Sequence, residues 1–370
     1  VAHPLDRAGA VANSVYGATD EAYIADIYYA ASAQIVAKAA AVLGLEETRQ
    51  NYQAIADRQW QVVKEEYFTA TGRCAVKTQT GLVLALKYHL SDNERLTEQM
   101  LRKLLRDNKN KLNTGFVGTP LLCNVLTEHG MTDLAYRLLL NEEYPGWLHE
   151  VKLGATTVWE RWNSLDENGR ISSTGMNSLN HYSYGAVLEW IFRHVAGIDV
   201  TEQGPGGKMM RISPKVDHKL GSASAVYDSA SGCYRCGWQI ENGDQITVTI
   251  TVPFGAKAQV ILPYAPDSVY HDTDNPLFET VENGICCVKA GQYTVTYKAA
   301  SPLKKSYSVD STLEDLLAEP AIRAFLSNMM EVDMIPDLAY GLTLRQAAEA
   351  FAGGVSAEQA QRLNVLLEEF

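Results

Sequence analysis

One carboxylate stands between two indoles in the run Trp159-Glu160-Arg161-Trp162, in a stretch with few other charges. Flat apolar rings stack on the C–H faces of sugars, and a carboxylate carries out the chemistry of glycosidic bond cleavage. The pattern therefore predicts a sugar-cleaving site with Glu160 as its catalytic carboxylate and with Trp159 and Trp162 against the substrate. The competing interpretation is an ion-paired glutamate near the start of a helix.

A second polar and aromatic cluster follows eighteen residues later, in the run from Asn177 to Gly185. Asn177, His181 and Tyr182 combine hydrogen-bonding groups with aromatic faces, which suits a polyhydroxylated ligand. We expect these three residues to bind substrate. A lone histidine is more often a packing residue, so that alternative stays open for His181.

Other chemistries find little support in the sequence. The nearby carboxylates Glu142, Glu143 and Glu150 lack paired indoles, and Cys233-Tyr-Arg-Cys236 is a lone CxxC without a second ligand pair. No His, Asp or Glu grouping has metal-ligand spacing, and no GxSxG nucleophile elbow occurs. We expect neither a metal nor a cofactor.

In the first part of the sequence, the elements that must position these residues are predicted to be helical hairpins. Apolar residues recur every three or four positions within segments that are separated by short links. The expected helices cover about 21–43, 46–67, 77–90, 92–107, 119–129, 131–141 and 178–196.

The hydrophobic period changes after Gly204-Pro-Gly-Gly207. Residues 245–252 alternate strictly between polar and apolar side chains, and Asn242-Gly243 before them is typical of a hairpin turn. An antiparallel β-sandwich is therefore expected. Helical patterns return after Pro302, over about 313–317, 321–330, 344–351 and 357–370. The predicted domains are residues 1–200, 201–303 and 304–370.

Composition limits the partners. The chain has 370 residues, is 46% hydrophobic and carries a net charge of −12 without a Lys/Arg block, which disfavours nucleic acid and anionic membranes. No apolar run approaches the ~20 residues that span a bilayer. The cysteine spacings favour free thiols and hence a cytoplasmic location. Secretion is the alternative, since the chain begins with Val1 and a removed signal would leave no trace.

Three ordered segments carry a resemblance to the bacterial α-L-rhamnosidases of glycoside hydrolase family 78: residues 113–120, 154–162 and 175–185. Thr78-Gln-Thr80 and Tyr144-Pro-Gly-Trp147 fit the same pattern. The resemblance covers roughly residues 20–300. It implies a six-hairpin (α/α) toroid followed by a β-sandwich, and an inverting hydrolase of terminal α-L-rhamnose. It also implies that Glu160 is the general base and that His181 contacts the sugar.

One departure from the family pattern concerns the general acid, which the resemblance places in an upstream segment rich in Asp, Arg, Glu and Trp. No such segment precedes residue 20. A toroid of six hairpins has twelve helices, and about seven or eight precede the sandwich here. We therefore expect the C-terminal part of the enzyme, completed by a missing N-terminal half or an oligomeric partner. The alternatives are another six-hairpin glycosidase and a non-catalytic fragment that binds sugar or a partner.

Overall fold

The computed structural model describes residues 18–368, except 167, 173–176, 203, 273, 274, 279 and 352. Residues 1–17 of the predicted first domain and 369–370 of the predicted tail lie outside the described part. The chain divides into two compact units. The first contains Val1–Gln239, Thr247–Pro263 and Asp267–Val295, and the second contains Ile240–Ile246, Tyr264–Pro266 and Thr296–Phe370.

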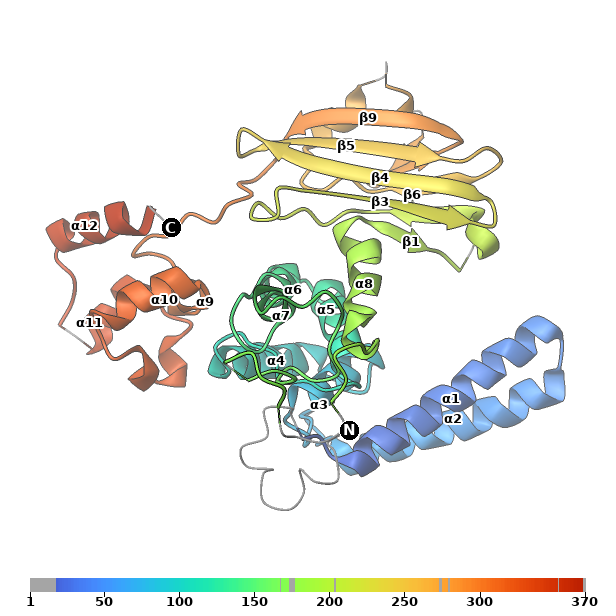
Figure 1. Cartoon of the computed structure of the whole chain (residues 1–370), viewed down its shortest axis with the longest axis horizontal. Helices are drawn as coiled ribbons and strands as arrows, with labels where there is room; N and C mark the ends of the chain where they lie inside the picture. The colour runs from blue at the N-terminus through green and yellow to red at the C-terminus, as the bar shows by residue number, and fades with distance from the viewer. Residues whose placement is uncertain are drawn as a thin grey trace. The chain divides into compact units, whose positions relative to one another are not determined.

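Helices are the main regular elements of the described chain up to residue 190 (Figure 1). They are α1 (Glu21–Leu43), α2 (Glu46–Tyr67), α3 (Gln79–Lys87), α4 (Glu94–Asp107), α5 (Thr119–Glu128), α6 (Thr132–Leu139), α7 (Trp147–Lys152) and α8 (Val187–Trp190). The helical hairpins predicted from the apolar period are confirmed, and the bounds of α1 and α2 agree with the prediction.

The first hairpin, α1 with α2, shows how local signals set these helices. The Asp20 side chain caps α1 by accepting the Tyr23 N–H at 2.9 Å, and Gly44 ends the helix in the left-handed region at φ 71°. Asp26 on α1 then accepts hydrogen bonds from Gln59 and Tyr67 on α2, at 3.1 and 3.0 Å. The hairpin is therefore held by polar contacts between its helices as well as by apolar packing.

The prediction of one helix over 178–196 is wrong. Helical structure begins with a 3-10 turn at Ser183–Ala186, passes through α8 and ends in a π-helical turn at Ile191–Val195. Residues 178–181 are engaged in backbone pairing with an earlier segment. That tertiary pairing overrides the local helical pattern.

Two sheets follow the helices. The five-stranded sheet has the order β1-β2-β6-β8-β7, and the four-stranded sheet has the order β3-β4-β5-β9. Their strands are β1 (Ile198–Val200), β2 (Met209–Ile212), β3 (Ser222–Ser229), β4 (Gly232–Glu241), β5 (Gln245–Val252), β6 (Lys257–Val260), β7 (Val281–Glu282), β8 (Ile285–Val288) and β9 (Gly291–Lys298).

The expectation of purely antiparallel strands needs one correction, because β2 and β6 pair in parallel. The chain between them runs through the antiparallel strands β3, β4 and β5 of the other sheet, so it re-enters the five-stranded sheet in its original direction. The predicted turn is confirmed: Asn242 and Gly243 have φ values of 51° and 81° between β4 and β5.

The described part of the second unit contains the α-helices α9 (Leu313–Ala318), α10 (Pro320–Ser327), α11 (Leu344–Phe351) and α12 (Ala357–Glu368). They enclose a core of their own that includes Val309, Leu316, Ile322 and Leu367. None of the described helices is both long enough and apolar enough to cross a membrane.

Candidate active site

The two motifs singled out in the sequence are joined by backbone hydrogen bonds. The Glu160 N–H donates to the Ser178 carbonyl at 2.9 Å, and the His181 N–H donates to the Val158 carbonyl at 2.7 Å. The segments 157–160 and 178–181 therefore run together as a short ladder. This ladder pairs the backbone segment of the predicted carboxylate with the segment that carries the predicted sugar-binding histidine.

The Glu160 carboxylate is itself part of the ladder. Its Oε2 accepts the Ser178 N–H at 2.7 Å, and the side chain is half-buried. Within the described residues, the other oxygen, Oε1, accepts no hydrogen bond. One oxygen thus holds the carboxylate in place while the other is open to a water or a substrate hydroxyl.

His181 lies between two aromatic rings. Phe116 stacks on it at a centroid distance of 5.2 Å and 12°, and Tyr182 stacks at 5.1 Å and 13°. Its Nδ1 accepts the Ser183 N–H at 3.3 Å, which in the neutral ring leaves the proton on Nε2 as a donor. Tyr182 is 85% exposed, so one face of this aromatic stack is open to solvent.

Only one end of the Asn177 side-chain amide is hydrogen-bonded within the described residues. Its Nδ2 donates to the Ser164 carbonyl at 2.8 Å, while its buried Oδ1 has no hydrogen-bond partner among the described residues. A buried carbonyl oxygen without a donor costs about 1–3 kcal/mol. A ligand hydroxyl would satisfy this oxygen.

The indoles on either side of Glu160 are enclosed. Trp159 is 3% exposed and Trp162 is 1% exposed. The Trp162 ring stacks on Tyr184 at 4.1 Å and 6°, meets the edge of Trp147 at 5.4 Å, and donates from Nε1 to the Thr114 carbonyl at 3.1 Å. Sugar stacking on Trp159 and Trp162 stays a prediction, and it requires the rings to become accessible.

Hydrogen bonds from a side chain on α3 hold the segment that carries Phe116. Gln79 donates from Nε2 to the Lys111 carbonyl at 3.0 Å and accepts the Asn113 N–H at 2.8 Å. Trp162 adds the hydrogen bond to Thr114 described above. The described parts of the resemblance segments 78–80, 113–120, 154–162 and 175–185 therefore converge. Phe116 lies inside one of them, but no local sequence signal assigned it a contact with His181.

Gly118 is the point of closest approach between this segment and α3. A Cβ atom at Gly118 would lie 2.3 Å from Thr80 Oγ1 and 3.0 Å from a Thr114 methyl carbon. We expect Gly118→Ala to destabilise the helical part by about 1–3 kcal/mol, because stiff β-branched side chains cannot move aside. Urea unfolding followed by circular dichroism measures this. Thr80→Ala should recover part of the loss in the double variant, and full additivity would contradict the clash.

Glu150 is the carboxyl group that burial perturbs in this region. It is 3% exposed, and its Oε1 has no hydrogen-bond partner among the described residues. Burial raises the pKa of Glu150 to about 8, and the nearby Trp159 backbone N–H opposes this rise. From the sequence, Glu150 was only an alternative candidate for the catalytic carboxylate, without tryptophans on both sides. Its burial comes from the fold and has no sequence signature.

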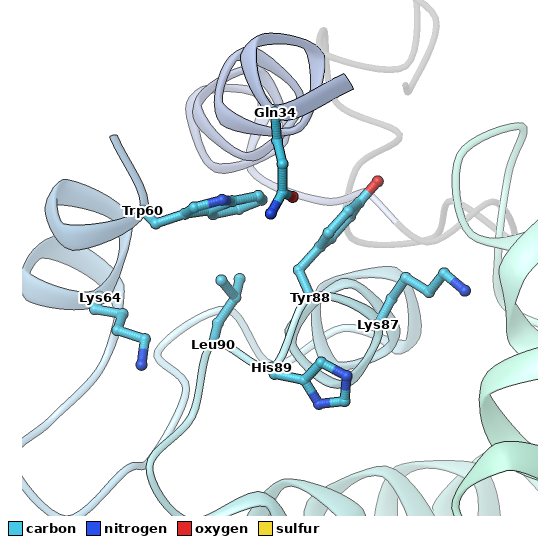
Figure 2. A pocket seen from close by; sticks show the side chains of 7 residues that line it. All are labelled: Gln34, Trp60, Lys64, Lys87, Tyr88, His89 and Leu90. Atoms are coloured by element: carbon cyan, nitrogen blue, oxygen red, sulfur yellow. The ribbon is translucent and has the colours of Figure 1, made fainter. Parts of the chain in front are cut away.

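A separate cavity of about 340 Å³ lies at the C-terminal end of α3. Figure 2 shows the residues that line it: Gln34, Trp60, Lys64, Lys87, Tyr88, His89 and Leu90. The predicted site residues contact the segment held by the N-terminal end of α3, so this cavity is distinct from the Glu160 site. Across the described ranges, no three His, Cys, Asp or Glu side chains gather as metal ligands.

Two family models match this chain. Residues 5–195 match the bacterial α-L-rhamnosidase six-hairpin glycosidase domain, and residues 197–275 match the bacterial α-L-rhamnosidase C-terminal domain. The first match covers more than half of the sequence and contains every predicted site residue. The second covers β1 to β6 and the chain that follows them.

Named relatives agree with these matches. The chain is 36% identical over 270 residues to an α-L-rhamnosidase of Formosa agariphila, covering 72% of this chain and 29% of that protein. It is 35% identical over 283 residues to one from an Alteromonas species, covering 75% and 30% respectively. The chain thus spans less than a third of either relative.

Solved structures give the same result. The crystal structure of Streptomyces avermitilis α-L-rhamnosidase complexed with L-rhamnose matches with a TM-score of 0.68 and 32% identity, over 75% of this chain and 27% of that one. The native enzyme of Aspergillus terreus matches with a TM-score of 0.67 and 28% identity, over 77% and 31%. The chain therefore belongs to the bacterial α-L-rhamnosidase six-hairpin glycosidase family.

Proposed function

We propose that this chain supplies the general base and part of the sugar-binding surface of an inverting α-L-rhamnosidase. The substrate would be a glycoside with terminal, non-reducing α-L-rhamnose. The observation that supports the proposal is the ladder between 157–160 and 178–181, which ties the Glu160 carboxylate to the backbone of the segment that carries His181. Family membership supplies the sugar class.

In the proposed reaction, Glu160 takes a proton from water through its free oxygen, Oε1. The water oxygen bonds to the anomeric carbon as the bond to the leaving oxygen breaks, and a carboxylic acid protonates that leaving oxygen. An inverting pair needs its two carboxyl groups about 6.5–9.5 Å apart, with the water beside the base. Asn177 Oδ1 would accept a sugar hydroxyl, and His181 Nε2 would donate to one.

The proposed general acid belongs to the remaining helices of the toroid. Those helices would lie in the same polypeptide or in a partner chain that completes the ring. The short span of this chain relative to its named relatives supports this division. The proposed function requires neither nucleic acid nor a membrane as a binding partner.

Aryl glycosides test the proposed substrate class. We expect the native-length protein to hydrolyse 4-nitrophenyl α-L-rhamnoside and not the corresponding glucosides, and we expect the 370-residue chain alone to be inactive. Proton NMR of the first-formed sugar should show the β-anomer, as inversion requires. Preferential glucoside hydrolysis would instead assign another six-hairpin glycosidase, and sugar binding without hydrolysis would assign a non-catalytic role.

A further inference from the structure

The cavity at the C-terminal end of α3 has an aromatic wall built from two segments. Trp60 on α2 and Tyr88, which follows α3, place their ring centroids 5.3 Å apart with the rings tilted at 33°. Both side chains are half-buried, so a ligand can reach their rings. The buried side chain of Leu90 adds apolar surface to the same cavity. A space of about 340 Å³ therefore has flat apolar faces on its sides.

Contacts within the protein hold the part of this wall that carries Tyr88. The Tyr88 N–H donates to the Leu84 carbonyl at 3.1 Å, and the Leu90 N–H donates to the Ala85 carbonyl at 3.0 Å. The Tyr28 ring on α1 meets Tyr88 edge-on at a centroid distance of 6.4 Å. The wall is therefore preformed, and a preformed site does not lose binding free energy to the ordering of its own side chains.

Three polar groups at this wall are available to a ligand. The Trp60 indole N–H, the Tyr88 hydroxyl and the Gln34 amide make no hydrogen bond within the described part of the chain. Figure 2 shows the Gln34 side chain reaching from α1 toward the two rings. Four other tryptophans differ in this respect, since each donates its indole N–H to a protein oxygen: Trp147, Trp162, Trp190 and Trp238.

The basic side chains of the lining already have carboxylate partners. The paired atoms are Lys64 Nζ with Asp92 at 3.1 Å, Lys87 Nζ with Glu128 at 3.8 Å, and His89 Nδ1 with Glu94 at 2.7 Å. An anionic ligand would have to compete with these carboxylates. A neutral ligand with several hydroxyl groups needs no such exchange, and it can use the polar groups that lack a partner.

We propose that this cavity is a second carbohydrate-binding site, which takes one pyranose ring of a neutral saccharide. The C–H face of the sugar stacks on the Trp60 indole, and its hydroxyls bond to the Gln34 amide and the Tyr88 hydroxyl. The cavity volume is at the small end of the ~300–1,000 Å³ range of ligand sites, which suits a single ring. No carboxyl side chain is among the described lining residues, so the sugar is held there without being hydrolysed.

Saturation-transfer difference NMR tests this site in the native-length protein, with methyl β-D-glucopyranoside and phenol as separate probes. We expect saturation to reach the ring C–H protons of the glucoside. Phenol should bind more weakly, because its single hydroxyl leaves polar groups of the cavity unpaired. Trp60→Ala should weaken glucoside binding about tenfold or more, as truncation of a central tryptophan commonly does. Gln34→Leu should weaken it about two- to tenfold, the usual effect of one lost hydrogen bond.

Tyr52→Ala is the matched control, since it removes a partly exposed ring on the same helix but outside the lining. It should bind the glucoside like the wild type, and circular dichroism verifies that each variant is folded. If Trp60→Ala does not fold, Gln34→Leu decides the question, because it leaves the aromatic wall in place.

Three results would overturn the inference. They are the absence of glucoside binding to the wild type, wild-type binding in both cavity variants, and tighter binding of phenol than of the glucoside. The last result would assign the cavity to aromatic compounds. None of these measurements uses rhamnoside hydrolysis, so the outcome is independent of the proposed function.

Discussion

Glu160→Gln is expected to lower kcat for an α-L-rhamnoside by about 10²–10⁴-fold while the protein stays folded, because general-base catalysis contributes about that much. The amide still fills the space of the carboxylate, and its oxygen can still accept the Ser178 N–H. It cannot take a proton from water. KM should change much less than kcat, since the proposed sugar contacts of His181 and Asn177 are retained.

The measurement is steady-state hydrolysis of 4-nitrophenyl α-L-rhamnoside by the native-length protein, with circular dichroism to verify the fold. Glu142→Gln is the matched control, since its carboxylate is exposed and pairs with Lys152 at the surface. In Glu160→Ala, added azide should partly restore turnover and yield a rhamnosyl azide, because a small anion can attack in place of the activated water. Turnover near the wild-type rate in Glu160→Gln would contradict the proposal that Glu160 is the general base.

Trp162→Ala is expected to destabilise the helical part by about 3–5 kcal/mol, the usual cost of deleting a buried aromatic side chain. The deletion removes the stacked contact with Tyr184, the edge contact with Trp147 and the hydrogen bond to Thr114. Trp162→Phe keeps a ring against Tyr184 but leaves the Thr114 carbonyl without its donor. That variant should lose about 1–3 kcal/mol.

Urea unfolding followed by far-ultraviolet circular dichroism measures both Trp162 variants without depending on indole fluorescence. Phe254→Ala removes an exposed ring between β5 and β6, so its unfolding midpoint should match the wild type. A stable Trp162→Ala protein that has lost only sugar affinity would show that the ring is a binding platform. That result would contradict the core role.

The sequence was most informative where a signal repeats over many residues. The helices Glu21–Leu43 and Glu46–Tyr67 are long enough to display several apolar turns, and strand Gln245–Val252 alternates throughout. Helix α7 has only six residues, so it has no detectable period and was not predicted. The helix expected from 178 begins at 183, because residues 178–181 pair with segment 157–160: the Ser178 carbonyl, which a helix would use, accepts the Glu160 N–H.

The candidate site divides in the same way. Glu160 and His181 could be predicted as site residues from the sequence, because the aromatic and polar residues next to them are typical of a sugar-binding site. The ladder that joins them, the stacking of Phe116 on His181 and the enclosure of Glu150 depend on contacts between segments distant in the chain. Glu150 also stands next to the exposed Val151, so no apolar pattern marks it as buried.

The ladder has a consequence for the chain that it encloses. The chain leaves the ladder after Glu160 and returns to it at Ser178, and between them the Asp166 side chain accepts the N–H groups of Asn168 and Arg170 in a turn. The entropy of closing a loop grows only with the logarithm of its length, about 0.6 kcal/mol per doubling. Homologues can therefore lengthen or shorten the turn at Asp166 at little thermodynamic cost, while Trp162 stays packed and the Glu160 carboxylate keeps its place.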